Sequence, residues 1–212
     1  LNTALGLQLE LVPFYSYKHK DLMIPSIMTP MLSQIFGYFL GDGNFEERGL
    51  RFRDARLEVL ESYNYFFKKI FNVNGKITKM KNKNCYTLYI NSTEISEFFK
   101  LIIPEIFNYI GKSKKEVIVE FIKGFVDAEG HIDKKRAKIT ISQKEKQILR
   151  YLQLFLLRLG IRSFLRFDVG KKKISNLSIR DRDVLNYLQI GFTASDKQKQ
   201  LLTWIEHYRK PY

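Results

Sequence analysis

The chain has 212 residues, of which 45% are hydrophobic and 14% aromatic, so it can bury the core of one large domain or two small ones and is not a disordered chain. A single cysteine and three histidines without a close pair exclude a disulfide framework, a cysteine-rich zinc site and a metal held between two imidazoles. The net charge of +14 at pH 7 favours a polyanionic partner.

Helix and strand signals follow one another along the first half of the chain. Thr29 and Pro30 offer an N-cap followed by proline at the first helical position, and this helix should end at Gly43. The spacing of apolar residues then changes from helical to alternating. It predicts a strand over residues 50–53, a helix over 54–71, a hairpin of strands 76–80 and 86–90, and a helix over 93–102.

The second half repeats this order. Ser113 and Glu116 form a capping-box pattern before a helix that should end at Gly130. It is followed by a strand over 138–142, a helix over 145–159, a hairpin of 163–169 and 173–179, a helix from 181 and a last helix over 196–207. Each half reads helix, two strands, helix, two strands, helix, which predicts an α+β fold with an antiparallel sheet per half. We expect an N-terminal extension over 1–28 and half-domains over 29–112 and 113–212.

A nine-residue pattern occurs twice, at residues 35–43 and 122–130, with a constant offset of 87 positions and no gap. Each copy has apolar or small residues at the same places and ends in an acid followed by glycine. Small residues four apart share one helix face; they are Gly37 and Gly41 in the first copy and Gly124 and Ala128 in the second. Such stripes let two helices approach closely, so we expect the helices to pack there and to bring Asp42 and Glu129 together.

Two carboxylates at the ends of adjacent helices suit a hard divalent cation. Mg²⁺ prefers carboxylates, carbonyl oxygens and water. The last carbonyls of a helix lack partners, so those of Gly41 and Ala128 are expected to join Asp42 and Glu129 as ligands. Such an ion activates water and stabilises charge on the oxygens of a phosphodiester, which predicts Mg²⁺, or Mn²⁺ in its place, at this point.

Positive charge is concentrated between Gly130 and Arg182. This stretch contains fifteen Lys or Arg and four acids, so its net charge of +11 accounts for most of the +14 of the chain. Several of these residues alternate with apolar ones, as expected of a strand with one basic face, and clustered cations suit phosphates. We expect double-stranded DNA to contact Arg48, Arg51, Arg53, Lys76, Lys79, Lys81, Lys83, Lys135, Arg136, Lys138, Arg166, Lys171, Lys172, Lys173 and Arg180.

The two nine-residue copies, their spacing and the element order resemble the LAGLIDADG homing endonucleases, specifically the single-chain, two-motif type encoded in introns and inteins. The resemblance implies two αββαββα half-domains about a pseudo-twofold axis, with saddle-shaped sheets in the DNA major groove. It implies a monomer that cuts both strands across the minor groove, leaves 3′ overhangs and binds Mg²⁺ through Asp42 and Glu129. It covers about residues 29–207.

The resemblance extends to three further site residues. Gln143 and Lys144 resemble the polar pair that positions water, and Lys197 resembles a basic residue near the scissile phosphates. Asp54 and Ala55 stand near the equivalent place of the first half, without the amide or the lysine, so the two sites are not equivalent.

The length of a strand predicts the length of the target. A strand of about ten residues spans about 33 Å, close to one turn of B-DNA, so two sheets end to end would cover roughly 20 base pairs. The rivals are a maturase that binds its own intron RNA and a non-cleaving DNA-binding protein on the same fold.

No apolar run suits a membrane span and no signal peptide is seen, so we expect a soluble protein of a prokaryotic or archaeal cytoplasm, or else of an organelle, with no membrane partner.

Overall fold

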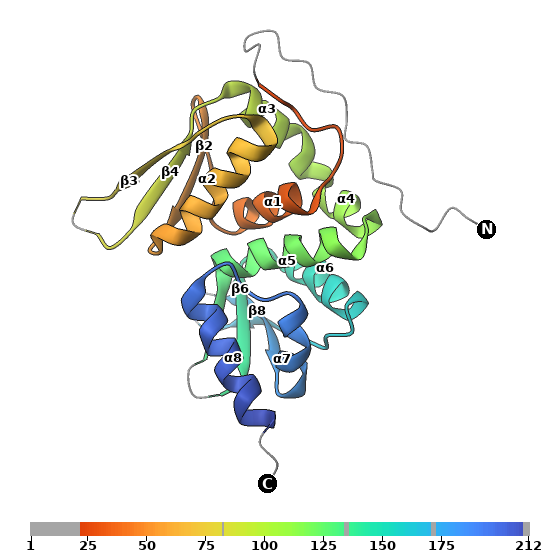
Figure 1. The fold of residues 1–212 in the computed structure, drawn as a ribbon. Coiled ribbons are helices and arrows are strands. Elements are labelled where there is room, and N and C mark those ends of the chain that lie inside the picture. The colour runs from red at the N-terminus through yellow and green to blue at the C-terminus, as the bar shows by residue number, and fades with distance from the viewer. Residues whose placement is uncertain (1–21, 82, 134–135, 171–172, 210–212) are drawn as a thin grey trace.

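Two similar halves lie on either side of a central pair of helices (Figure 1). The computed structural model describes residues 22–81, 83–133, 136–170 and 173–209, so most of the expected extension 1–28 lies outside the described residues. The central helices are α1 (Pro30–Asp42) and α5 (Lys115–Glu129), which contain the two copies of the nine-residue pattern and pack along each other. Of the described helices, none is both long and apolar enough to cross a bilayer.

The first half contains a four-stranded antiparallel sheet in the order β1-β2-β4-β3. Its elements after α1 are β1 (Asn44–Glu46), β2 (Gly49–Asp54), α2 (Leu57–Phe71), β3 (Lys76–Lys79), β4 (Tyr86–Ile90) and α3 (Thr93–Ile102). A short 3₁₀ turn (Ile103–Glu105) and α4 (Ile106–Lys112) then lead to α5. The sequence predicts neither β1 nor α4 individually. The three residues of β1 are too few for alternation to be recognised, and the seven residues of α4 span only about two helical turns.

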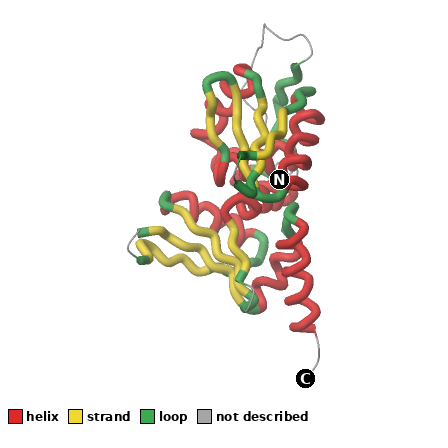
Figure 2. Tube along the Cα trace, turned by 90° about the vertical axis from the view of Figure 1, so that its left-hand side faces the viewer, coloured by secondary structure: helices red, strands yellow, loops and turns green. Residues whose placement is uncertain are grey.

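The second half repeats the sheet, in the order β5-β6-β8-β7. Its elements after α5 are β5 (Gly130–Ile132), β6 (Lys138–Gln143), α6 (Lys146–Arg158), β7 (Phe164–Val169), β8 (Ile174–Arg180), α7 (Arg182–Asn186), a 3₁₀ turn (Tyr187–Gln189) and α8 (Ser195–Arg209). Both sheets lie on one side of the molecule, with most helices behind them (Figure 2). The predicted α+β class with two pseudo-symmetric halves is therefore confirmed.

The start of α1 is as predicted and the start of α5 is not. The Thr29 hydroxyl accepts a hydrogen bond from the Leu32 amide (3.2 Å), and Pro30 occupies the first turn. The N-cap of α5 is Lys114, which has no side-chain cap. The Ser113 hydroxyl instead donates to the Tyr109 carbonyl (2.7 Å) at the end of α4. The capping-box interpretation is wrong because a second helix, α4, ends directly before α5 and uses this serine.

Gly37 and Gly124 lie where α1 and α5 are in direct backbone contact. A Cβ atom on Gly37 would lie 2.1 Å from the carbonyl oxygen of Phe121, and one on Gly124 would lie 2.1 Å from that of Gln34. Real Cβ atoms essentially never come within 3.0 Å of such an atom. The two glycines therefore allow a helix separation that any other residue would prevent.

The core continues from one half into the other through these helices, but its composition differs between the halves. The first half buries mainly aromatic rings, including Phe36, Tyr38, Phe52, Tyr63, Phe67, Phe71, Phe98 and Phe99. The second buries mainly aliphatic side chains, including Ile139, Ile141, Leu149, Leu152, Leu156, Leu177 and Ile179. In both sheets these residues occupy the face that the helices cover. The opposite face, called here the outer face, carries mainly polar residues together with the exposed rings of Tyr89 and Phe164.

Candidate active site and nucleic-acid interface

The ends of α1 and α5 bring the two motif acids into one place. Asp42 is the last residue of α1 and Glu129 the last of α5. A Cβ atom on Gly41 would lie 2.5 Å from the Cβ of Ala128 and 3.1 Å from the Cγ of Glu129. The close contact of the helices thus continues to their C-terminal ends, where all four proposed metal-site residues lie together.

Both carboxylates have pKa values above the ordinary range. Burial and, second, the Asp42 carboxylate raise the pKa of Glu129 to about 7, against the opposing effect of Lys197. Partial burial and then the carboxylate of Asp54 raise the pKa of Asp42, against the opposing effects of Arg53 and Arg51. Two groups that ionise this reluctantly mark a place where negative charge is poorly compensated, and a bound cation would relieve it.

The donor set at this place fits Mg²⁺ better than a metal that needs many protein ligands. Among the described residues, no three His, Cys, Asp or Glu side chains are grouped closely enough to hold a metal ion. The available donors are two carboxylates and helix-terminal carbonyls, all of them oxygen. Mg²⁺ keeps several of its own waters and is commonly bound by one or two carboxylates, so this small oxygen set is sufficient for it.

Gln143 lies next to one of the two acids. It ends β6, and its side-chain amide donates a hydrogen bond to the Glu129 carboxylate (3.0 Å between Nε2 and Oε1). The next residue, Lys144, is exposed and makes no hydrogen bond to the described part of the chain. Of the predicted polar pair, therefore, the amide is oriented toward the acid and the ammonium group is left to solvent.

The equivalent place in the first half is arranged differently. Asp54 ends β2 and accepts a hydrogen bond from the Tyr38 hydroxyl (2.8 Å) and two from the Arg56 guanidinium (both 2.8 Å). Burial would raise the pKa of Asp54, but the hydrogen bonds and charge of Arg56 outweigh it and lower the pKa. Asp54 is thus paired with Arg56, whereas Gln143 is hydrogen-bonded to the motif acid Glu129.

Two cations meet at the end of α5. Lys197, in the first turn of α8, donates to the carbonyl oxygens of Val126 (3.1 Å) and Asp127 (2.7 Å). Arg56 donates to the same Asp127 carbonyl (3.2 Å), so it joins the first half to the second. Burial and then the charge of Arg56 lower the pKa of Lys197 to about 8. No motif in the sequence marks Arg56, because its partners come from distant segments.

The Asp127 side chain has a different environment from its carbonyl. It is fully buried, and its carboxylate accepts hydrogen bonds from the backbone amides of Thr193 (3.0 Å) and Ala194 (3.5 Å), immediately before α8. The Thr193 hydroxyl in turn accepts a hydrogen bond from Gln34 of α1 (2.7 Å). Asp127 therefore fixes the start of α8, and with it Lys197, rather than facing the motif acids.

Strand register decides which of the expected DNA contacts share a surface. The outer faces of the two sheets carry Arg51, Arg53, Lys76, Lys138, Arg166 and Arg180. Exposed turns and bends carry Arg48, Lys81, Lys83, Arg136 and Lys173. Lys79 pairs with Tyr86 and shares the helix-covered face with Ile77, which corrects its expected place. Lys135, Lys171 and Lys172 lie outside the described residues.

These features define a single chain of two α+β repeats. The two motif helices pack against each other, and each has an acid at its C-terminal end. The chain belongs to the LAGLIDADG family, because the family model described as a LAGLIDADG-like domain matches residues 29–103 and 116–190. The resemblance seen in the sequence is confirmed by this match.

Curated relatives contain a similar segment within longer proteins. A glutamine–fructose-6-phosphate aminotransferase of Methanocaldococcus jannaschii is 37% identical over 195 residues, which are 84% of this chain and 18% of that protein. An A-type ATP synthase subunit of Pyrococcus abyssi is 26% identical over 192 residues, 84% of this chain and 19% of that protein. The chain thus spans less than a fifth of the length of these relatives.

The homing endonuclease I-DmoI of Desulfurococcus mucosus is similar in both sequence and structure. It is 29% identical over 113 residues, 52% of this chain and 55% of I-DmoI. Its structure in complex with DNA and Mn has a TM-score of 0.61 at 20% identity and covers 77% of this chain and 96% of that one. Full-length WhiA of Thermotoga maritima has a TM-score of 0.64 at 17% identity, over 97% of this chain and 66% of that one. At these identities the structures show a shared fold.

Proposed function

We propose that the chain is a site-specific double-strand DNA endonuclease that uses Mg²⁺, or Mn²⁺ in its place, and leaves 3′ overhangs in a target of roughly 20 base pairs. The observation that carries the proposal is the convergence of Asp42 and Glu129 at the ends of α1 and α5, both with raised pKa values. I-DmoI, which shares the fold, has been crystallised with DNA and with Mn, Ca or Mg.

The motif acids and their neighbours would divide the work. Asp42 and Glu129, with the carbonyls of Gly41 and Ala128, would hold Mg²⁺, which when bound activates water and stabilises charge on the phosphodiester oxygens. Gln143 keeps the Glu129 carboxylate in one orientation through its 3.0 Å hydrogen bond. Lys197, held at the end of α5 with a pKa of about 8, supplies positive charge beside the developing negative charge of the reacting phosphate.

Binding to DNA is assigned to the outer faces of the two sheets. Their guanidinium and ammonium groups suit phosphates and base edges, and the helices cover the other faces. A monomer with two such faces would meet the two halves of an asymmetric target. The rivals, an intron RNA maturase and a non-cleaving DNA-binding protein, would need neither Asp42 nor Glu129.

The curated relatives support a mobile origin for the segment. An aminotransferase and a component of an ATP synthase share no activity, yet each contains a segment similar to this chain that makes up less than a fifth of its length. A segment common to unrelated proteins does not produce the activity that names them. We therefore propose that it is an inserted element and that its target is a copy of a host gene without the insertion.

The test uses plasmids that carry a library of candidate insertion sites, incubated with and without Mg²⁺, followed by sequencing of new DNA ends. We expect cuts at one defined site that require Mg²⁺ and that disappear in Asp42→Asn while binding remains. Glu61→Gln is the matched control, since it also removes one acid, at an exposed position on α2. Normal cutting by Asp42→Asn refutes the metal assignment. Tight binding to intron RNA without DNA cutting supports the maturase instead.

A further inference from the structure

Glu46 is an acid on a surface that otherwise carries positive charge. It ends β1, and the pairing of β1 with β2 puts it on the outer face of the first sheet with Arg51 and Arg53. It forms an ion pair with Arg51 of the neighbouring strand, in which the arginine side chain is 22% exposed and the glutamate 36%. If this face binds DNA as proposed above, an acid there opposes phosphate binding and requires another explanation.

Arg51 lies in a row of residues that crosses the whole sheet. The registers place Asn44 opposite Arg51, Arg51 opposite Tyr89, and Tyr89 opposite Lys76. Four strands about 4.8 Å apart give this row a width of about 14 Å. The major groove of B-DNA is about 12 Å wide and admits two neighbouring strands, so part of this row, with Arg51 on an inner strand, can face the edges of bases at one time.

The Arg51 guanidinium is held in place although its hydrogen-bonding capacity is not used up. Its Nε is buried and has no hydrogen-bond partner among the described residues, and the ion pair with Glu46 is made through one terminal nitrogen, Nη1. A guanidinium is planar and has five N–H donors. An acid that fixes this plane, with donors left over, is the arrangement needed to present two parallel donors to one acceptor pair.

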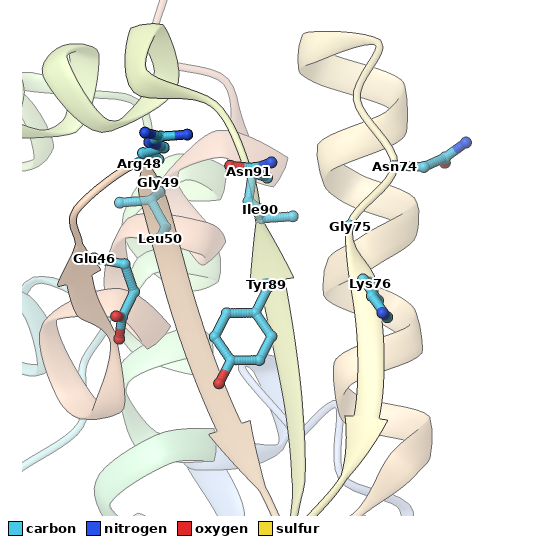
Figure 3. A pocket seen from close by; sticks show the side chains of 10 residues that line it. All are labelled: Glu46, Arg48, Gly49, Leu50, Asn74, Gly75, Lys76, Tyr89, Ile90 and Asn91. Atoms are coloured by element: carbon cyan, nitrogen blue, oxygen red, sulfur yellow. The ribbon is translucent and has the colours of Figure 1, made fainter.

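Next to the ion pair the outer face is hollowed. The hollow has a volume of about 440 Å³, and its lining includes Glu46, Arg48, Lys76 and Tyr89. Figure 3 shows the side chains of Glu46 and Tyr89 projecting from β1 and β4 on the same side of the sheet. Of the ion pair, Glu46 lines this depression, and Arg51 lies at its edge through the contact with Glu46.

We propose that Arg51 and Glu46 form a specificity-determining pair that reads one G·C base pair of the target. Arg51 donates to the O6 and N7 atoms of guanine, the pairing that its fork geometry favours. Glu46 is a positioning residue, which keeps the guanidinium in the plane of the base and lowers the cost of ordering it on binding. This inference rests on the proposed function, since it assigns base recognition to the same DNA-binding surface.

The role of Glu46 can be separated from its charge. Removing an acid from a DNA-binding surface strengthens binding to every sequence by a similar factor, because the effect acts through phosphates. Removing an orienting partner of Arg51 instead weakens discrimination at one base pair only. Glu47, the next residue, is exposed in the turn and has no ion pair with the described residues, so Glu47→Ala provides the charge control.

The experiment measures affinity in the absence of Mg²⁺ for the target and for every single-base substitution in the half that the first sheet covers. We expect Glu46→Ala to lower discrimination at one G·C pair by about five- to a hundredfold, and Arg51→Lys to do so at the same pair. Glu47→Ala should leave the profile unchanged. Glu46→Gln, which keeps an acceptor, should restore part of the discrimination, and Glu46→Ala with Arg51→Lys should add little to either change.

Two results overturn the inference in distinguishable ways. If Glu46→Ala and Glu47→Ala shift affinity for all sequences by the same factor, the ion pair has no part in recognition, while selective binding by the unaltered chain leaves the proposed function standing. If the unaltered chain prefers no target sequence, both the pair and the proposed function fail. Thermal unfolding of each variant checks that the fold is kept, since a partly exposed ion pair at the surface adds little to stability.

Discussion

The contact between α1 and α5 allows one prediction to be worked out in detail, the effect of adding a single methyl group at Gly124. The new Cβ would lie 2.1 Å from the Gln34 carbonyl oxygen and 3.0 Å from the Tyr38 amide nitrogen. Both neighbours are backbone atoms of the facing helix and cannot turn away as a side chain would. Restoring the 3.0 Å that Cβ atoms require means moving the helices apart by about 1 Å.

The energetic cost has two parts of opposite sign. Overpacking a tightly packed contact costs about 1–3 kcal/mol or more, while replacing glycine by alanine inside a helix gains about 1 kcal/mol. We expect Gly124→Ala to lower the free energy of unfolding by about 2 kcal/mol. The same movement separates Asp42 from Glu129. The rate of cleavage should therefore fall even under conditions in which the Gly124→Ala protein remains fully folded.

Gly111 provides the matched control. It lies in α4, and a Cβ atom there would meet only a ring carbon of Phe155 at 3.6 Å, an ordinary contact. The same substitution should therefore stabilise the chain by up to about 1 kcal/mol. Urea unfolding of the unaltered chain, Gly124→Ala and Gly111→Ala measures the loss and the gain in the free energy of unfolding. Equal stability of Gly124→Ala and Gly111→Ala would refute the backbone contact as the reason for the motif glycines.

Three further predictions concern charge. Arg56→Met should cost about 3 kcal/mol because it leaves the buried Asp54 carboxylate without its cation. Since the pairing lowers the pKa of Asp54, this stabilisation is present above its unfolded pKa of about 4 and declines as the pH falls from there through the lowered pKa of the folded state. A difference in stability between the two proteins that does not shrink as the pH is lowered contradicts the assignment. At limiting Mg²⁺, cleavage should rise as the pH increases through about 7, where Glu129 loses its proton; Mg²⁺ titrations that coincide at pH 6 and pH 8 would count against this carboxylate as a ligand. Binding to target DNA should weaken by orders of magnitude between roughly 50 and 200 mM salt, and an affinity that is flat over this range would exclude the basic outer faces as the binding surface.

Much of the fold could be read from the sequence because the features concerned are local or repeated. The motif helices show small residues four apart in both copies, and the hairpin strands show alternation long enough to be recognised. The predicted capping of α5 by Ser113 is wrong because this serine suits two neighbouring helices equally well, and only the arrangement of α4 decides between them.

Of the candidate site, the sequence predicts best the residues that lie within the repeated nine-residue pattern. Asp42 and Glu129 stand at equivalent places in the two copies, so one implied the other. Arg56 has no counterpart in the repeat and contacts residues 71 and 140 positions away. The misplaced Lys79 reflects strand register, which reverses the face of every side chain when it is shifted by one residue.

The backbone contact at Gly37 and Gly124 also bears on how such a protein can change its target. The separation of the two motif acids depends on main-chain atoms of α1 and α5, whereas the residues of the outer faces belong to strands packed on the far side of the core. If the outer faces bind DNA as proposed, substitutions on the sheets can alter which sequence is bound without altering the distance between the acids. In such a molecule recognition is free to drift during evolution, or to be redesigned, while the geometry of the proposed cut stays fixed by three glycines and an alanine.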